Sequence, residues 1–234
     1  MQNKKNQKTT GRRRLRKLLW LLLDVGIVAV LLAMLFYKPP GFRPVAVVGG
    51  TEQSTYLTNY LLPQLYNGAQ AGKPYHLTLT QQGIMDIVAH SDWPQHAGSA
   101  TVNAPSVAFE PGRIILMTTV TIDAASLLVT VVVEPTFTRQ GLLHLHLAKV
   151  KVGAANVTPL ARLVARKMYD QYNAAALNAD DIRQRILASL INEEPFDPVL
   201  TLPPLPGSRR LRVRIRNAAV ENEKLTLHLV PLQD

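Results

Sequence analysis

The chain has 234 residues, of which 47% are hydrophobic and 18% are charged, and its formal net charge is +10. A chain of this length and composition can bury a core of ordinary size. It contains no cysteine, which excludes disulfides and thiolate metal sites.

The positive charge is concentrated at the N-terminus. Eight of the 26 basic residues lie within residues 1–17, which contain no acidic residue, so the rest of the chain carries 18 basic against 16 acidic residues. The eight are Lys4, Lys5, Lys8, Arg12, Arg13, Arg14, Arg16 and Lys17. A basic tail on a nearly neutral domain does not indicate a general nucleic-acid-binding protein, and we expect no nucleic-acid partner.

Residues 18–37, LLWLLLDVGIVAVLLAMLFY, contain one charged residue, Asp24. As a helix this run is about 30 Å long, the thickness of a hydrocarbon core. A carboxylate at the membrane centre costs about 2.5–3.5 kcal/mol, whereas thirteen Leu, Ile, Val and Phe residues return about 4–8 kcal/mol. The sequence therefore predicts a single-pass transmembrane helix. Because the basic tail precedes it, we expect a cytoplasmic N-terminus and an extracytoplasmic C-terminal domain in the cell membrane.

The following segment, residues 38–50, contains three prolines and is expected to be a linker. We expect one extracytoplasmic α+β domain over residues 51–234. It begins with an amphipathic helix ending near residue 66 and a strand at 75–80. Thr80 is placed to cap a helix over 81–90. Residues 92–106 are rich in turn-forming residues, which predicts a loop.

Two long strands, at 113–122 and 127–137, carry apolar residues on both faces. A strand with one solvated face would alternate apolar and polar residues. Leaving six large aliphatic side chains in water would forgo about 9–18 kcal/mol. Because this matches a domain's whole net stability of about 5–15 kcal/mol, both faces must be covered.

The remaining elements follow in order. A strand at 141–153 changes its apolar phase after Leu147, which indicates a bulge or a change in burial along the strand. Thr158 and Pro159 are typical of a helix start, and the helix to residue 173 has an apolar stripe through Leu160, Leu163, Val164 and Met168. A second helix is predicted at 180–190. A proline-rich, extended connector at 193–207 leads to two final strands.

The second face of the long strands leaves two possibilities open. Helix 158–173 covers one face, and the other is covered either by a second layer in a closed core or by an acyl chain in an apolar ligand groove. The groove would be lined by residues from two strands and the helix, namely Ile115, Met117, Leu128, Val132, Leu163 and Met168.

Four arginines alternate with apolar residues near the C-terminus, so that one strand face carries Arg210, Arg212, Arg214 and Arg216. Such a row is suited to phosphate groups of lipid heads or to an anionic envelope polymer. The alternative is a solvated face that protects a sheet edge.

No catalytic or metal-binding pattern is present in the sequence. His144 and His146 share one strand face, but no acidic residue nearby completes a metal site. No serine lies in a nucleophile-elbow motif. We therefore expect no enzymatic activity, no metal and no cofactor.

The order of these segments resembles the bacterial YpmS-like family of membrane-anchored extracytoplasmic proteins, and the related LmeA-like domains that share features with tubular lipid-binding folds. The segments that carry the resemblance are LTLTQQGIMDIV, VAFEPGRIILMTTVTI with LLVTVVVEPTF, and GLLHLHLAKVKVGAANVTPLARLVARKMY. The resemblance implies a strongly curved antiparallel sheet against a long helix, enclosing an apolar groove. We expect a membrane-anchored domain that binds a lipid or another amphiphile; the alternative is a cell-envelope scaffold that holds protein partners without a ligand.

Overall fold

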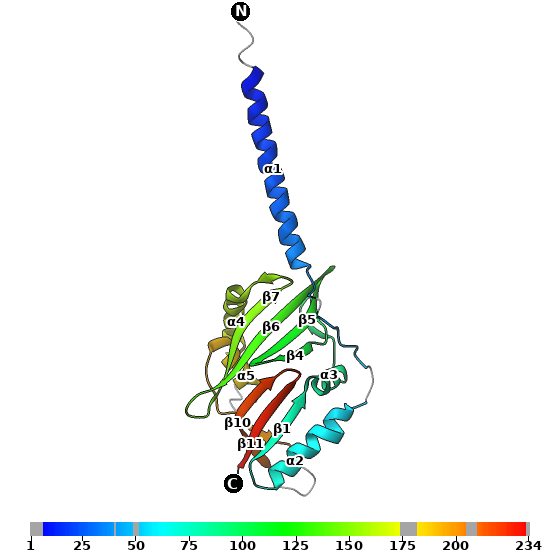
Figure 1. Ribbon diagram of the computed structural model, residues 1–234, viewed down its shortest axis with the longest axis vertical. Coiled ribbons are helices and arrows are strands. Elements are labelled where there is room, and N and C mark those ends of the chain that lie inside the picture. Colours follow the sequence, from blue (N-terminus) through cyan, green and yellow to red (C-terminus); the bar gives the residue numbers. More distant parts are fainter. Residues whose placement is uncertain (1–6, 40, 49–51, 174–181, 205–209, 233–234) are drawn as a thin grey trace, which may run out of the picture.

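The computed structural model describes residues 7–39, 41–48, 52–173, 182–204 and 210–232 (Figure 1). Over these ranges the chain has an α+β fold with five α-helices, one π-helical turn and antiparallel strands. The helical elements are α1 (Gln7–Leu35), η1 (Leu57–Leu61), α2 (Leu62–Gln70), α3 (Gln81–Ala89), α4 (Thr158–Asn173) and α5 (Ile182–Asn192). The strands are β1 (Tyr75–Thr80), β2 (Gln95–Ala97), β3 (Ala100–Val102), β4 (Ser106–Glu110), β5 (Arg113–Ile122), β6 (Ala125–Phe137), β7 (Leu143–Val152), β8 (Ala155–Asn156), β9 (Val199–Leu202), β10 (Leu211–Glu221) and β11 (Lys224–Leu232).

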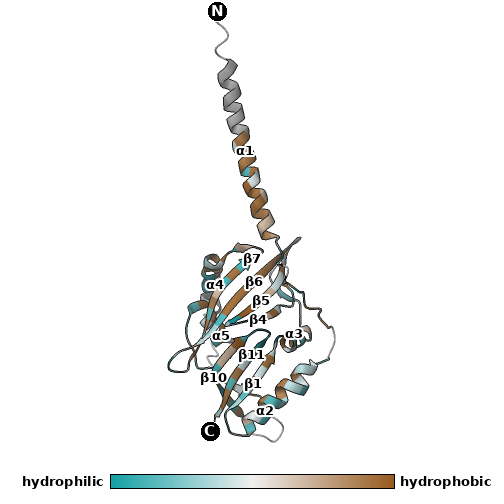
Figure 2. Ribbon diagram, viewed as in Figure 1, coloured by the Kyte–Doolittle hydropathy of each residue, from teal (hydrophilic) through white to brown (hydrophobic). Residues whose placement is uncertain are grey.

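Helix α1 is 29 residues long and projects from one end of the domain (Figure 1). Most of its described part is hydrophobic (Figure 2). Within the ranges that the structure describes, no helix meets the length and hydropathy that a membrane crossing requires.

The strands are divided between two antiparallel sheets, neither strongly curled, where the family resemblance implies one strongly curved sheet. The smaller sheet has the order β1-β11-β10-β9. The larger has the order β2-β3-β5-β6-β7-β8, with β4 also paired to β5. The C-terminal hairpin lies between β1 and β9 in the smaller sheet, and β8 covers only the last two residues of the outer edge of β7.

Side chains from α4 and α5 occupy that edge. The Leu145 amide donates to Ser189 Oγ at 2.9 Å, and Arg162 donates to the Leu147 carbonyl at 2.8 Å. Leu143 exchanges backbone hydrogen bonds with Phe196. Polar partners therefore replace the missing strand, which protects β7 from pairing with another chain.

Helix α4 begins at Thr158 and ends at Asn173 as predicted, but the Thr158 hydroxyl bonds to the neighbouring strand. The Thr158 hydroxyl accepts a hydrogen bond from the Val150 amide at 2.8 Å, and Asn156 Oδ1 accepts one from the Thr158 amide at 3.1 Å. Thr158 therefore ties α4 to the strand edge. Thr80 does cap α3 as predicted, since its hydroxyl accepts from the Gly83 amide at 3.0 Å.

The apolar stripe of α4 does not pack on the sheet, and that prediction is wrong. Leu160, Leu163 and Val164 are 61%, 68% and 49% exposed. The reason is that α4 contacts the strand edge through the polar groups of Thr158 and Arg162.

The change of phase in strand 141–153 is a β-bulge, as one of the two interpretations predicted. Val132 pairs with Lys149 and Val133 pairs with Leu147, so Ala148 is the extra residue.

Two segments contain more regular structure than predicted. The 92–106 segment includes β2, β3 and the start of β4, and the proline-rich connector includes β9, which pairs with β10. Residues 205–209 of this connector, and residues 180–181 at the predicted start of the second helix, lie outside the described ranges.

One face of the long strands is closed by the chain itself. Ile114 and Leu116 of β5 pack with Phe109 of β4 against a cluster that includes residues of the smaller sheet. The other members of this cluster are Val107, Val220, Leu225 and Ile84. The two sheets and α3 therefore share one core, and the opposite face of β5 and β6 is the one that needs another cover.

Candidate functional site

The opposite face of β5 and β6 is only partly covered, and a cavity of about 590 Å³ lies over it. Its floor includes Ile115, Met117 and Val132, three of the residues predicted for a groove. The sheet register explains why they share a face, because Ile115 pairs with Val132 and Met117 pairs with Thr130. The second face of these strands is thus neither solvated throughout nor fully closed.

Two lysines from β7 line the same cavity. Lys149 pairs with Val132 and Lys151 pairs with Thr130, which places both lysines beside the apolar floor. Neither has an ion-pair partner among the residues that the structure describes. The sequence signal for them is the alternation of LAKVKV, in which lysine recurs at every second position.

Two of the other charged residues of the lining, Arg113 and Glu134, form an ion pair, and the third is Glu110. Arg113 Nε lies 3.0 Å from Glu134 Oε1, and Glu110 is the register partner of Arg113. With Lys149 and Lys151, the lining holds three basic and two acidic residues. The net positive charge of this lining favours an anionic group next to the apolar floor.

The cavity lies where α1 meets the domain. Tyr37 and Pro39, just after α1, line it together with Gly153 and Ala154 from the turn between β7 and β8. The Ala154 amide donates to the Met34 carbonyl at 2.7 Å. The end of α1 is therefore held beside the cavity. Figure 1 shows this end of α1 next to the larger sheet.

A second cavity, of about 670 Å³, adjoins the first at Met117. Ser106 and Ala108 place it over the same face of the sheet, beyond β5. Its remaining lining is mostly polar and comes from the linker, the start of α3 and the β10–β11 turn, including Gln81 and Glu223. Met117 is the residue that the two linings share, and the cavity on the α1 side has the more apolar lining.

The structure does not bring the other predicted groove residues to this cavity. Leu128 lies on the same sheet face by register but is 2% exposed and absent from the lining, so it belongs to the core. Leu163 lies on the exposed face of α4. Met168 belongs to α4, but its side chain lies outside the described part of the structure.

The arginine row is on the smaller sheet, and none of its members lines either cavity. Arg210 precedes β10, and Arg212 is exposed on it. Arg214 pairs with Asp197, with 2.7 Å between Nη2 and Oδ2. A bulge between Ile215 and Asn217 takes Arg216 out of the alternating register. β9 covers β10 only from Leu211 to Arg214, so Arg212 and Arg214 do not lie on a free sheet edge, while Arg212 and Arg216 are exposed as a solvated face requires.

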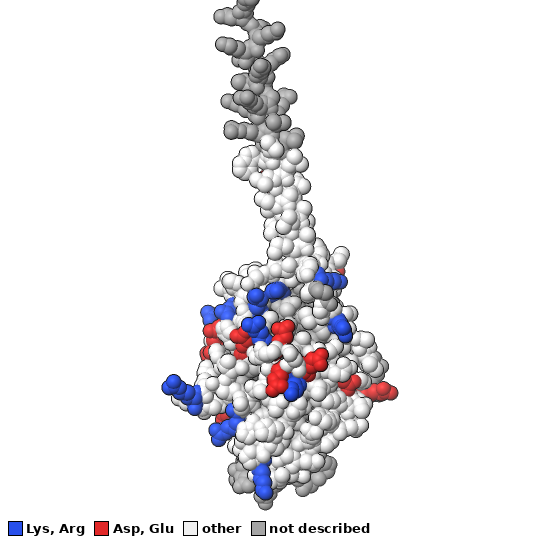
Figure 3. Space-filling view, viewed as in Figure 1, with Lys and Arg blue, Asp and Glu red and all other residues white. Residues whose placement is uncertain are grey.

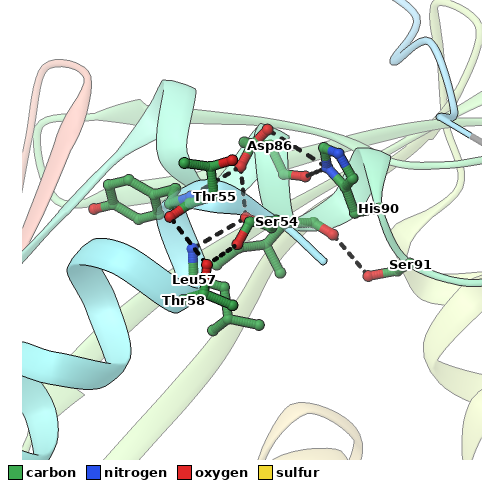
Figure 4. A network of polar contacts seen from close by, with 9 residues as sticks. Ser54, Thr55, Leu57, Thr58, Asp86, His90 and Ser91 are labelled. Carbon is green, nitrogen blue, oxygen red and sulfur yellow. Dashed lines mark hydrogen bonds and ion pairs between the residues drawn. The ribbon is translucent and has the colours of Figure 1, made fainter. Parts of the chain in front are cut away.

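Ser54, Asp86 and His90 form a polar network (Figure 4). Ser54 is 2% exposed; its hydroxyl donates to Asp86 Oδ2 at 2.5 Å and accepts from the Leu57 amide at 3.0 Å. The hydrogen bond from Ser54 lowers the pKa of Asp86, helped by the Tyr56 amide and by His90 and opposed by burial. The serine donates to the carboxylate rather than to the histidine, so the network caps a helix and does not activate a nucleophile.

Of the two histidines that alternate along β7, His146 lies near an acidic side chain. His146 Nδ1 lies 3.5 Å from Glu193 Oε1, which also pairs with Arg162 at 3.1 Å. Within the described residues, no group of three or more His, Cys, Asp or Glu side chains is placed to hold a metal ion.

Comparison with models of protein families, with curated proteins and with solved structures finds no match for this chain. The resemblance to the YpmS-like family stays a prediction, and the site is interpreted from its own chemistry.

Proposed function

We propose that this protein is a membrane-anchored extracytoplasmic domain that binds a lipid or another amphiphile in the cavity beside the end of α1. The observation that carries the proposal is the combination of an apolar floor, Ile115, Met117 and Val132, with the adjacent lysines Lys149 and Lys151. An acyl chain suits the floor, and an anionic head suits the lysines.

The exposure of α1 supports the anchor. Large apolar side chains from Leu19 to Met34 are exposed along this helix, and the described parts of the domain do not cover them. A surface of this kind on a protein marks contact with a partner or a membrane. The part of α1 drawn in white presents no charged side chain on the face in view, and several basic side chains lie at the adjoining end of the domain (Figure 3). This charge distribution suits an anionic lipid surface.

The size of the cavity supports a ligand with a short buried segment. Its volume of about 590 Å³ lies within the range of small-molecule sites, about 300–1,000 Å³. Each methylene group transferred from water contributes about 0.8 kcal/mol, so even part of an acyl chain supplies useful affinity. The strongly curved sheet implied by the family resemblance is not needed for this site.

The proposal is tested by purifying the full-length chain from bacterial membranes in mild detergent and quantifying co-purified lipids by mass spectrometry. The double variant Lys149→Gln/Lys151→Gln should retain roughly 10- to 30-fold less anionic lipid, at about 1 kcal/mol for each lysine. The matched control is Lys73→Gln/Arg139→Gln, which removes two exposed charges outside the cavity lining and should retain lipid as the wild type does.

A second variant tests the floor independently of charge. Val132→Trp fills the cavity and should reduce the lipid content while the protein stays folded, as checked by circular dichroism. Wild-type protein without lipid at any stoichiometry would contradict the proposal and favour the scaffold alternative.

A further inference from the structure

The first turns of α4 expose an apolar patch on the protein surface. Leu160, Leu163 and Val164, spaced as neighbours on one helix face, are 61%, 68% and 49% exposed. We call these three residues the α4 patch. Clustered exposed aliphatics of this kind are unusual on a surface that contacts only water.

The α4 patch is near the place where α1 leaves the domain. Helix α4 begins at Thr158, four residues after Ala154, whose amide is bonded to Met34. Leu160 is six positions after Ala154, so their Cα atoms are at most about 22 Å apart. Figure 1 likewise places α4 at the end of the domain from which α1 projects.

The charges of α4 bear on what the patch contacts. The helix has three basic residues and one acidic residue, Asp170; Arg162 is paired with Glu193, whereas Arg166 and Lys167 are exposed. An amphipathic helix with aliphatic residues and flanking basic residues is typical of helices that lie in the interface of an anionic membrane. A protein partner would need a complementary apolar surface, whereas a bilayer beside α1 supplies one.

We propose that α4 lies on the surface of the same membrane that holds α1, with the α4 patch in the boundary between head groups and acyl chains. This inference rests on the proposed anchoring by α1 and adds a second point of contact. Two contacts fix the orientation of the domain, and they hold the cavity at a constant height above the bilayer.

The experiment uses the absence of cysteine from the chain, which makes a single introduced cysteine a unique labelling site. Full-length protein carrying Leu163→Cys is labelled with an environment-sensitive fluorophore and reconstituted into vesicles of phosphatidylcholine and phosphatidylglycerol. The control is Gln140→Cys, an exposed position in the β6–β7 turn, at the far end of these strands from α1 (Figure 1). A lipid with a nitroxide near its head group serves as the quencher.

We expect the label at residue 163 to shift to the blue and to be quenched at least about fivefold more strongly by the nitroxide lipid than the label at residue 140. Equal quenching at both positions, or a blue shift without quenching, would overturn the inference and indicate solvent or a protein contact. Flotation of the vesicles distinguishes the contact made by α4 from the anchoring by α1. Protein that floats with an unquenched label contradicts only the role of α4, whereas protein that does not float contradicts the anchoring.

A charge variant provides an independent check that does not alter residue 163. Arg166→Gln/Lys167→Gln in the labelled protein should decrease quenching at residue 163 when the vesicles contain phosphatidylglycerol. Quenching that stays at the level of the unsubstituted labelled protein would show that these two cations do not hold α4 on the surface.

Discussion

The backbone amide of Ala154 donates a hydrogen bond to the carbonyl oxygen of Met34, across 2.7 Å, and so joins the last turn of α1 to the turn between β7 and β8. The final carbonyls of a helix have no partner within it, and this amide satisfies one of them. The neighbouring Gly153 has φ of 58°, and a Cβ there would lie 2.3 Å from the carbonyl oxygens of Met34 and Leu35. The close approach of the helix therefore depends on glycine.

Gly153→Ala should release α1 from the domain, because the added methyl group overlaps the helix end. The measurement is the distance distribution between spin labels at Leu31→Cys and Asp123→Cys, which should broaden in the variant. Gly112→Ala is the matched control: its φ is 73°, but nothing lies within 4 Å of an added Cβ. A distribution as narrow as that of the control would refute the docking of α1.

Asp86→Asn should lower the free energy of unfolding by about 1 kcal/mol at neutral pH, because hydrogen bonds to a charged acceptor are stronger than those to a neutral one. The pKa of Asp86 is lowered from 3.8 in the folded protein. Its contribution is therefore present above that value and is lost as the pH falls through the lower pKa of the folded state. Urea unfolding at several pH values should show the two proteins converging below about pH 3.8.

The exposed Asp92 provides the control for this pH dependence. Asp92→Asn removes the same charge outside the Ser54 network and should leave the free energy of unfolding within about 0.5 kcal/mol of the wild type. An Asp86→Asn variant as stable as this control at neutral pH would show that the network contributes nothing to stability.

Ser189→Ala should destabilise the protein by about 1–3 kcal/mol, because it leaves the Leu145 amide at the edge of β7 without its partner. Ser189 is fully buried, so water does not replace the hydroxyl. Thermal unfolding in detergent measures the effect. Ser91→Ala, which removes an exposed hydroxyl at the end of α3, is the control, and an equal melting temperature for the two variants would contradict the role of Ser189.

Much of the fold follows from local signals in the sequence. The helix cap at Thr80, the hairpin of the two long strands and the bulge after Leu147 were each predictable, because capping chemistry and side-chain alternation act over a few residues. The sequence does not reveal which strands pair across long separations. The pairing of β11 with β1 joins segments about 150 residues apart, and no local pattern in either strand indicates it.

Part of the candidate site was also predictable, because side-chain alternation along a strand is a local signal. Ile115, Met117 and Val132 follow from apolar residues on both faces of two neighbouring strands. Lys149 and Lys151 were missed because lysines that alternate with valines are typical of a solvated strand face. Only the strand register shows that they lie beside the cavity. Leu163 was misplaced because an apolar stripe indicates an apolar contact, and not whether that contact is the protein core or another surface.

The most direct test of the proposed function is photo-crosslinking of the full-length protein in vesicles that contain a phospholipid with a diazirine on its acyl chain. Peptide mapping by mass spectrometry should locate adducts within 113–117 and 130–134, the strand segments that contribute the cavity floor, in addition to adducts on α1. The Val132→Trp variant should lose the adducts on the strands and keep those on α1. Adducts on α1 alone in the wild-type protein would contradict lipid binding in the cavity.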